Sequence, residues 1–444
     1  MRMVTILPLV GLMALAPMPS AAQTLEQCLA QARAHAPSLK VADAAVVRAD
    51  QAVREARAAL SPTLRLSANA VENSEPQRAV FPIPGAPGPQ VIKLGSATAI
   101  DARLTADYTL YSGGRTGALV EAARAAGAGR VQDRLQADAD LVLRVSTSFY
   151  RVIAAQRLEA AADEALASAR TLRTTSAARV RAGVAPRLDS LRADVDLLGR
   201  TTAQLRAHEA VHLARVALET AIGAPLDTSQ ALVVPSGPQA TLPGAAESVE
   251  RAVRQRPEIA SLDAALRENQ LRYDAARAAH RPTVSLSATA QYLGPNRDED
   301  YWNPNDAGLR THKFFASVGV SMPIFDAGLI DARAKQIAAD RIAIEARRKE
   351  AELAIRSDVE QALSDVRVTL AEWQVDSSRT VIAREALRTA EAGYKGGTTT
   401  GTEVRDAEGV LADARADEAQ ALMNYWTART RYDYATGALA RKEN

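Results

Sequence analysis

The chain has 444 residues, of which 47% are hydrophobic, 24% are charged and 4% are aromatic. Its 54 Lys and Arg residues nearly balance 52 Asp and Glu residues, and the formal net charge of +2 excludes the strongly basic surface typical of nucleic-acid binding. Alanine makes up much of the hydrophobic fraction, which favours closely packed helices over one bulky globular core.

Residues 1–22 have the pattern of a cleavable export signal. Arg2 precedes an apolar stretch that starts at Val4 and ends near Met18, and small residues follow at Ser20 and Ala22. The apolar stretch is interrupted by prolines and is shorter than a membrane-spanning helix. We therefore expect an exported protein that is either soluble or enters a membrane as β-strands. The single cysteine, Cys28, cannot form an internal disulfide, and we expect it to be packed in a short helix.

A duplication organises the remainder of the chain. Residues 37–70 align without a gap to residues 257–290, and 14 of the 34 pairs are identical, including most of "SPTLRLSANA" against "RPTVSLSATA". Further along, the offset changes from 220 to 214 residues, and Gly114 aligns with Gly328. The sequence thus predicts a signal peptide (1–22), a first repeat of helices, two strands and a long helical hairpin (23–226), a linker (227–246) and a second repeat (247–444).

Each repeat begins with a helix, near 41–60 in the first, and the period of the hydrophobic pattern then becomes two. Apolar and polar residues alternate along 63–71 and 100–110, and again along 284–292 and 314–324. These lengths match strands that cross a bilayer at a tilt, although hairpins half-buried on a soluble core would show the same alternation.

Long stretches without proline follow the strands. They run from Gly114 to Ala182 and from Gly328 to Lys395, and as helices they would each be about 100 Å long. Each stretch ends at a glycine-containing turn, and a returning helix begins near Leu188 or Thr402. Apolar residues at spacings of three and four predict helices that pair side by side; they are Val142, Val145, Phe149 and Val152, then Val359, Leu363, Val366, Leu370 and Trp373, and on the first returning helix Leu188, Leu191, Val195 and Leu198.

Four membrane-length strands cannot close on themselves. Closed membrane barrels need at least about eight strands, because an open edge leaves backbone groups unpaired in lipid. We therefore expect the chain to assemble with copies of itself, with the strands forming a pore and the helices continuing it as a periplasmic tube.

In this order, and twice over, these motifs resemble the TolC family of outer membrane efflux proteins across essentially the whole mature chain. The resemblance rests on "YSGGR" at 111–115, on "FDAG" at 325–328 and on the two hairpin turns near Gly183 and Gly397. It implies a mainly α fold with a small β part, in which a homotrimer closes one 12-stranded β-barrel above an α-helical barrel of long antiparallel coiled-coil hairpins. It also implies a location in the outer membrane that extends into the periplasm.

The resemblance implies a passive channel with no cofactor and no enzymatic chemistry. An inner-membrane pump of the RND, ABC or MFS type would energise export, and a periplasmic adaptor would dock on the helical tube of this efflux or secretion system. The substrate, whether drug, metal ion or polypeptide, would be chosen by the pump.

The resemblance also marks residues at the narrow entrance of the channel. The family's acidic positions fall on Glu403 and Asp406, its hydrogen-bonding tyrosine falls on Tyr394, and Asp189 is the matching acid at the first tip. Threefold repetition would turn each acid into a ring that favours cations. Asp189 and Glu403 could instead stabilise the first turn of a returning helix. Thr399 occupies a position where some family members carry a gate-locking arginine, so we expect a closed state held by Tyr394 hydrogen bonds and packing.

At the junctions between strands and helices, only the pair Gly114 and Gly328 matches between the repeats, since Gly113 aligns with Ala327. We expect this pair to serve a turn that requires glycine rather than a direct role in transport.

Two other functions compete with the channel. "HEAVH" at 208–212 matches the helix of zinc peptidases, but Arg215 and Leu218 occupy the positions of the extended motif, and the apolar residues Val211, Ala214, Leu218 and Ile222 favour packing against a neighbouring helix. A periplasmic adaptor or a coiled-coil spacer is the second alternative. Adaptors carry one helical hairpin and several small β domains, whereas this chain predicts two hairpins and membrane-length strands.

Overall fold

The computed structural model describes residues 23–75, 78–82, 84–85, 87–93, 98–226, 232–233, 238, 243–293 and 312–441. The predicted signal peptide (1–22) and most of the predicted linker (227–246) lie outside the described residues. The elements follow one another as α1 (Leu25–His35), α2 (Pro37–Ala58), β1 (Thr63–Glu72), β2 (Arg78–Phe81), β3 (Gln90–Lys93), β4 (Thr98–Tyr111), α3 (Arg115–Arg181), α4 (Arg187–Ile222), α5 (Ala245–Gln255), α6 (Pro257–Arg277), β5 (Thr283–Leu293), β6 (His312–Ser321), α7 (Leu329–Gly396) and α8 (Gly401–Ala435), with short 3-10 helices at Ala278–His280 and Ala438–Arg441.

The chain forms two compact units. Of the described residues, the first unit contains those up to Asp43, those from Gln132 to Ile259 and those from Glu350 onward, and the second contains those from Ala44 to Val131 and from Ala260 to Lys349. Each unit draws segments from both halves of the sequence. The first holds α1, α4, α5, α8 and the greater parts of α3 and α7, and the second holds most of α6 and the β-strands.

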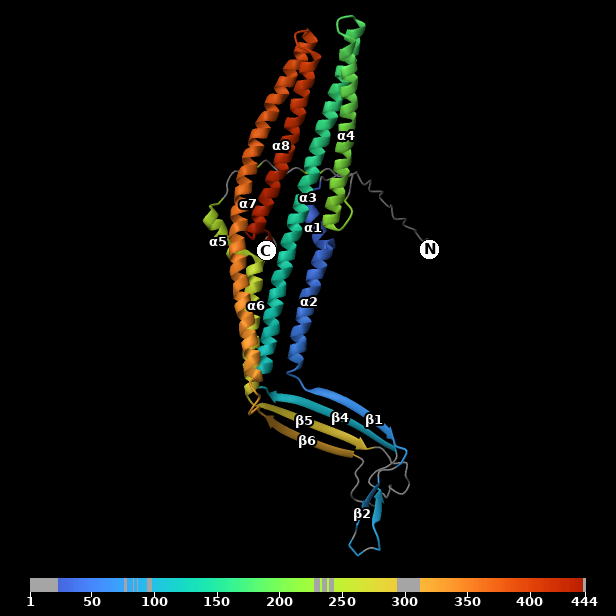
Figure 1. Cartoon of the computed structure of the whole chain (residues 1–444), viewed down its shortest axis with the longest axis vertical. Coiled ribbons are helices and arrows are strands. Elements are labelled where there is room, and N and C mark those ends of the chain that lie inside the picture. The colour runs from blue at the N-terminus through green and yellow to red at the C-terminus, as the bar shows by residue number, and fades with distance from the viewer. Residues whose placement is uncertain are drawn as a thin grey trace, which may run out of the picture. The chain divides into compact units, whose positions relative to one another are not determined.

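The second unit carries a four-stranded antiparallel sheet in the order β1-β4-β5-β6 (Figure 1). The register places apolar residues opposite apolar residues, as in Leu66 opposite Leu104 and Leu286 opposite Val318. Polar residues share the other face, where Ser287 donates a hydrogen bond to Asp107 and Gln291 donates one to Asp101. The alternation predicted along all four strands is confirmed, except that β6 ends at Ser321 and leaves Met322 and Ile324 beyond the strand.

A second, smaller sheet lies in the proline-rich segment between β1 and β4. Strands β2 and β3 pair there in antiparallel register, with Ala79 opposite Ile92 and Val80 opposite Val91. β-Branched residues favour this pairing, and each of the two strands has only four residues, which is too short for a clear alternating pattern.

The predicted long helices are confirmed. α3 has 67 residues and α7 has 68, so each is about 100 Å long. In the first unit, Val145, Phe149 and Val152 of α3 are fully buried and pack in one cluster with α1 and with Leu218 and Ile222 of α4. Cys28 belongs to the same cluster, as the sequence predicts for a packed cysteine in a short helix.

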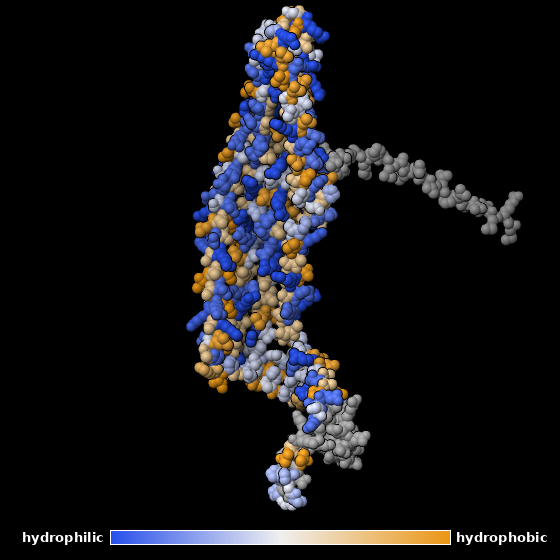
Figure 2. All heavy atoms as spheres, turned by 45° about the vertical axis from the view of Figure 1, so that its right-hand side comes forward, coloured by the Kyte–Doolittle hydropathy of each residue, from blue (hydrophilic) through white to orange (hydrophobic). Residues whose placement is uncertain are grey.

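One predicted packing surface is wrong for the single chain. Leu188, Leu191, Val195 and Leu198 share a face of α4, but 51–70% of each residue is exposed. Helical spacing identifies residues on one face without showing what covers that face. Figure 2 shows such apolar side chains interspersed among hydrophilic ones along the visible surface of the helices.

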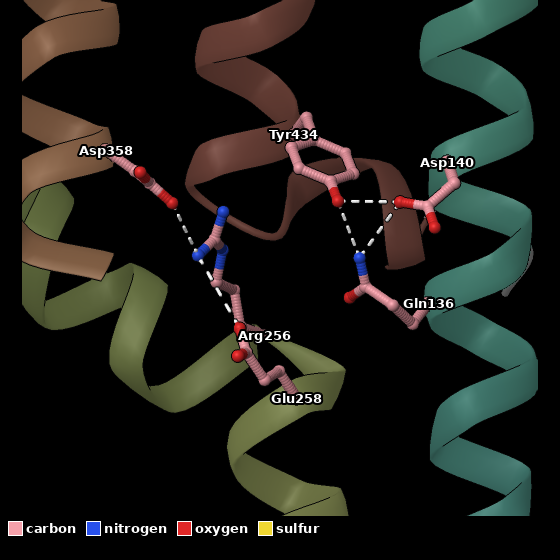
Figure 3. Close-up of polar contacts among 6 residues, drawn as sticks. All are labelled: Gln136, Asp140, Arg256, Glu258, Asp358 and Tyr434. Carbon is pink, nitrogen blue, oxygen red and sulfur yellow. Dashed lines mark hydrogen bonds and ion pairs between the residues drawn. The ribbon is translucent and has the colours of Figure 1, made fainter. Parts of the chain in front are cut away.

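Polar contacts join helices of the first unit near the end of α8 (Figure 3). The Tyr434 hydroxyl donates to Asp140 of α3 at 2.6 Å and accepts from Gln136 at 2.7 Å. Burial and the neighbouring Asp140 carboxylate raise the pKa of Tyr434 to about 12. Between α5 and α6, Arg256 forms an ion pair with Asp358 of α7 at 3.1 Å and lies over the Tyr434 ring, 5.6 Å from its centroid.

Candidate functional site at the hairpin tips

The first helical hairpin turns at Gly183, between α3 and α4. Gly183 has a φ of +73°, in the left-handed region that disfavours residues with a side chain. Its N–H donates to the carbonyl of Val180, and the Val184 N–H donates to the carbonyl of Arg179. These bonds satisfy carbonyl groups at the end of α3, so the predicted tip glycine terminates the helix.

The second hairpin turns at Gly397, which has a φ of +80°. The next helix, α8, begins with Thr400 as its N-cap. The Glu403 carboxylate accepts from the Thr400 N–H at 2.7 Å, and the Glu403 N–H donates to the Thr400 hydroxyl at 3.3 Å. This reciprocal capping box matches the alternative interpretation of Glu403, since its carboxylate is engaged within its own helix end.

Tyr394 joins the second tip to the first hairpin. The residue is buried, and its hydroxyl lies 3.3 Å from the hydroxyl of Ser176 on α3. Arg179 donates to the Tyr394 carbonyl at 3.0 Å, and its guanidinium lies 4.7 Å from the centre of the tyrosine ring. Leu172 and Val404 are buried against the same ring. We call Leu172, Ser176, Arg179, Tyr394 and Val404 the tip cluster.

The other two predicted acids occupy the returning helices. Asp189 lies in the first turn of α4, which has no side-chain cap, and a carboxylate there complements the positive end of the helix dipole. Asp406 is exposed on α8, one turn after Glu403. Thus Asp406 points to solvent in the single chain, whereas Glu403 is bound in its capping box.

The junctions between strands and helices are turns of one type. Gly114 and Gly328 have φ values of +90° and +82°, and the positions before them, Gly113 and Ala327, have +65° and +52°. The mismatch between Gly113 and Ala327 therefore does not change the turn. A Cβ at Gly113 would lie 2.6 Å from the Cβ of Arg281, so the first turn needs glycine for space as well as for conformation.

The helix that follows each junction is capped by a side chain. Ser112 accepts from the Thr116 N–H, and Asp326, at the matching position of the second repeat, accepts from the N–H groups of Gly328 and Ile330. The bonds from Ile330 and Gly328 lower the pKa of Asp326. The junction glycines thus lie in the turn that precedes each capped helix, and their positive φ values agree with the expected turn that requires glycine.

The histidines of "HEAVH" lie on α4. His208 is exposed and contacts Glu159 of α3 at 2.7 Å, and this contact raises its pKa. Val211, Ala214, Leu218 and Ile222 are buried, as predicted for the packing face of this helix. In the part of the chain that the structure describes, no group of three or more His, Cys, Asp or Glu side chains is arranged to hold a metal ion.

Comparison with known families decides between the channel and the two competing functions, a zinc peptidase and a periplasmic adaptor or coiled-coil spacer. A family model described as outer membrane efflux protein matches residues 28–224 and 249–438. The chain belongs to the outer membrane efflux protein family. The family is one of outer membrane channel proteins and not of enzymes, in agreement with the resemblance seen in the sequence.

Two curated relatives are outer membrane proteins TolC. The chain is 23% identical to TolC of Salmonella enteritidis over 169 residues and 24% identical to TolC of Escherichia coli K12 over 177 residues. Each match covers 37% of this chain and 34% of the relative, so the chain matches about a third of the length of these two proteins.

Solved structures of outer membrane channels share the fold. The channel CusC superimposes with a TM-score of 0.75 at 18% identity, over 93% of this chain and 92% of that one. The open state of the MtrE channel of Neisseria gonorrhoeae gives 0.72 at 22% identity, over 93% and 88%. The fold of an efflux-family channel, with long helices and a small antiparallel sheet, therefore accounts for nearly the whole chain.

Membership of the efflux family does not by itself reveal the partners of Tyr394. Ser176 and Arg179 lie more than 200 residues away in the sequence, and both were missed by sequence reasoning. A polar Ser176 between apolar positions of a packed helix was the only available signal.

Among the described residues, no helix combines the length and apolar composition needed to cross a bilayer.

Proposed function

We propose that this chain is the outer membrane channel of a tripartite efflux or secretion system, and that it works as a homotrimer. Its four strands would join those of two copies in one 12-stranded barrel. Substrates would enter from an inner-membrane pump and a periplasmic adaptor and would leave through the barrel.

The four-stranded sheet is the observation that carries this proposal. One face presents apolar side chains, among them Leu64, Leu66 and Val318, each at least 64% exposed. The other face is polar and internally hydrogen-bonded. β1 and β6 are the outer strands of the described sheet. An apolar face suits lipid, a polar face suits an aqueous lumen, and outer strands need partners within a membrane.

The exposed apolar face of α4 supports assembly as well. α7 carries a comparable row, in which Val368, Val375 and Ile382 recur every seven residues and are 52–70% exposed. Heptad spacing is typical of a coiled-coil seam. We expect the α4 face of one copy to pack against the α7 row of the next.

The gate residues are also part of the proposal. With the tips gathered around a threefold axis, Asp189 and Asp406 would form acidic rings that favour cations. Glu403 would contribute mainly to the start of α8. Tyr394 would hold the second hairpin against the first through the tip cluster.

Two measurements test the channel. Chemical crosslinking of the detergent-solubilised protein should trap a trimer, and the same preparation should produce discrete conductance steps in a planar lipid bilayer. A monomer in the soluble periplasmic fraction that gives no conductance would instead indicate the periplasmic adaptor or coiled-coil spacer. A photo-crosslinking amino acid at exposed Val184, in the turn of the first hairpin, should capture the adaptor in cells.

A further inference from the structure

A carboxyl group without a dedicated cation is buried where the two hairpins meet. Glu408 of α8 is only 5% exposed within the single chain. Its Oε1 accepts a hydrogen bond from the Ser168 hydroxyl of α3. Its Oε2 is buried and has no hydrogen-bond partner among the described residues. Glu408 therefore forms a direct polar contact between the first and second hairpins, and only one of its two carboxyl oxygens accepts a hydrogen bond from the described residues.

The surroundings of Glu408 disfavour its negative charge. Asp196 of α4 faces it, with a buried Oδ2 that also has no partner in the described structure, and Glu391 of α7 lies nearby. Arg200 of α4 opposes these charges, but it lies 3.5 Å from Asp196, with which it is already paired. Burial, followed by Asp196 and Glu391, raises the pKa of the Glu408 carboxyl above its ordinary value, while Ser168 and Arg200 oppose the rise.

A cavity of about 300 Å³ adjoins this contact and is lined by α3, α7 and α8. Glu408 and Ser168 line this cavity. The other charged residues of its lining are Glu164, Arg384, Arg388, Glu391 and Arg415. Glu164 and Arg415 neutralise each other in an ion pair at 2.5 Å. The cavity is large enough for water, which gives protons a route to the contact.

We propose that Glu408 is a positioning residue that makes the contact between the two hairpins depend on protons. The protonated, neutral side chain is favoured between α8 and α3, whereas the carboxylate is disfavoured there because it is buried beside Asp196 without a cation of its own. The hydrogen bond from Ser168 favours the carboxylate and so opposes this effect. The consequence for conductance rests on the channel function proposed above.

The sign follows from the raised pKa. A separated, solvated Glu408 would lose its proton near the ordinary pKa of 4.5, whereas the buried group keeps its proton to a higher pH. The packed arrangement is therefore favoured at low pH and loses stability as the pH rises from 4.5 through the raised pKa. One proton per protomer limits the change in the ratio of packed to separated hairpins to about tenfold per pH unit.

Single-channel recordings between pH 5 and pH 8 test the proposal in the full-length protein. The wild type should spend less time in its low-conductance state as the pH rises. Glu408→Gln keeps a hydrogen-bonding partner for Ser168 but cannot ionise, so its low-conductance dwell times should lose this pH dependence. Glu418→Gln, on the same helix, is the matched control and should retain the wild-type profile.

A second readout does not require a conducting pore. Unfolding followed by circular dichroism in detergent should show that the wild type loses more stability between pH 5 and pH 8 than Glu408→Gln. Identical pH profiles for wild type and Glu408→Gln in both assays would overturn the proposal. Absence of conductance together with the expected difference in unfolding would refute the channel function and leave the role of Glu408 intact. If Glu408→Gln does not fold, Ser168→Ala replaces it and should shorten low-conductance dwell times most at high pH, because the lost hydrogen bond favours the carboxylate.

Discussion

Tyr394→Phe tests the tip cluster by removing one hydroxyl. The lost contact with Ser176, at 3.3 Å, is a neutral hydrogen bond in a buried site and contributes about 0.5–1.5 kcal/mol. Phenylalanine keeps the ring that Arg179 covers at 4.7 Å. Since 1.4 kcal/mol corresponds to a factor of ten, the ratio of closed to open hairpins should fall about two- to tenfold per protomer.

Single-channel recording measures this ratio through the time spent in the low-conductance state. Tyr394→Leu also removes the aromatic face under Arg179, which contributes about 0.5–2 kcal/mol more, so conductance should rise in the order wild type, Phe, Leu. Tyr273→Phe, on α6 and outside the tip cluster, serves as the control. Closed dwell times of Tyr394→Phe equal to those of the wild type would refute the role of the hydroxyl, and equal values for Tyr394→Leu would refute the tip cluster altogether.

Three further predictions concern the junctions, the sheet and the polar network of α8. Gly113→Ala should cost about 1–3 kcal/mol of stability and so lower the unfolding temperature, because Gly113 has a positive φ and lies close to the Cβ of Arg281. Ala327→Gly should leave stability unchanged or raise it. Melting curves equal to that of the wild type for Gly113→Ala would contradict this prediction. Val318→Arg on the apolar face of β6 should destabilise the membrane-inserted protein by about 2–4 kcal/mol and reduce the amount of the proposed trimer in outer membrane fractions. Ser317→Arg on the polar face should not. Equal amounts of trimer for the two variants would argue against strands in lipid. The neutral Tyr434 side chain is favoured in the folded protein, so the free energy of unfolding should fall as the pH rises from 10 to the Tyr434 pKa of about 12. The expected loss is about 1 kcal/mol after allowing for the partial exposure of the side chain. Thermal unfolding of Tyr434→Phe in detergent that shows the same pH dependence as the wild type would contradict this prediction.

Much of the fold could be predicted because its signals are local. Alternation along 63–71 and 100–110 marks strands, and proline-free stretches ending at Gly183 and Gly397 mark the long helices. Their bounds in the structure agree closely with these signals, because turn conformation and side-chain period depend on neighbouring residues only.

The site could be predicted only in part, because its contacts depend on how distant helices face each other. The sequence places Tyr394 next to a tip, but it does not show that Arg179 lies on its ring. Likewise, helical spacing groups Leu188 with Val195 without revealing that this face is uncovered in one chain. The capping role of Glu403 was predictable as an alternative, since Thr400 stands three residues before it.

The outer strands of the sheet have a consequence for biogenesis. β1 and β6 are the outer strands of the described sheet, and open strand edges are prone to pair with other extended peptides. A newly exported copy that folded its four-stranded sheet while still in water would expose both outer strands and would be prone to aggregate with its neighbours. In the trimer proposed above, the joining of subunits and their entry into lipid should therefore be coupled, so that the barrel closes only when the other two copies are already beside the first.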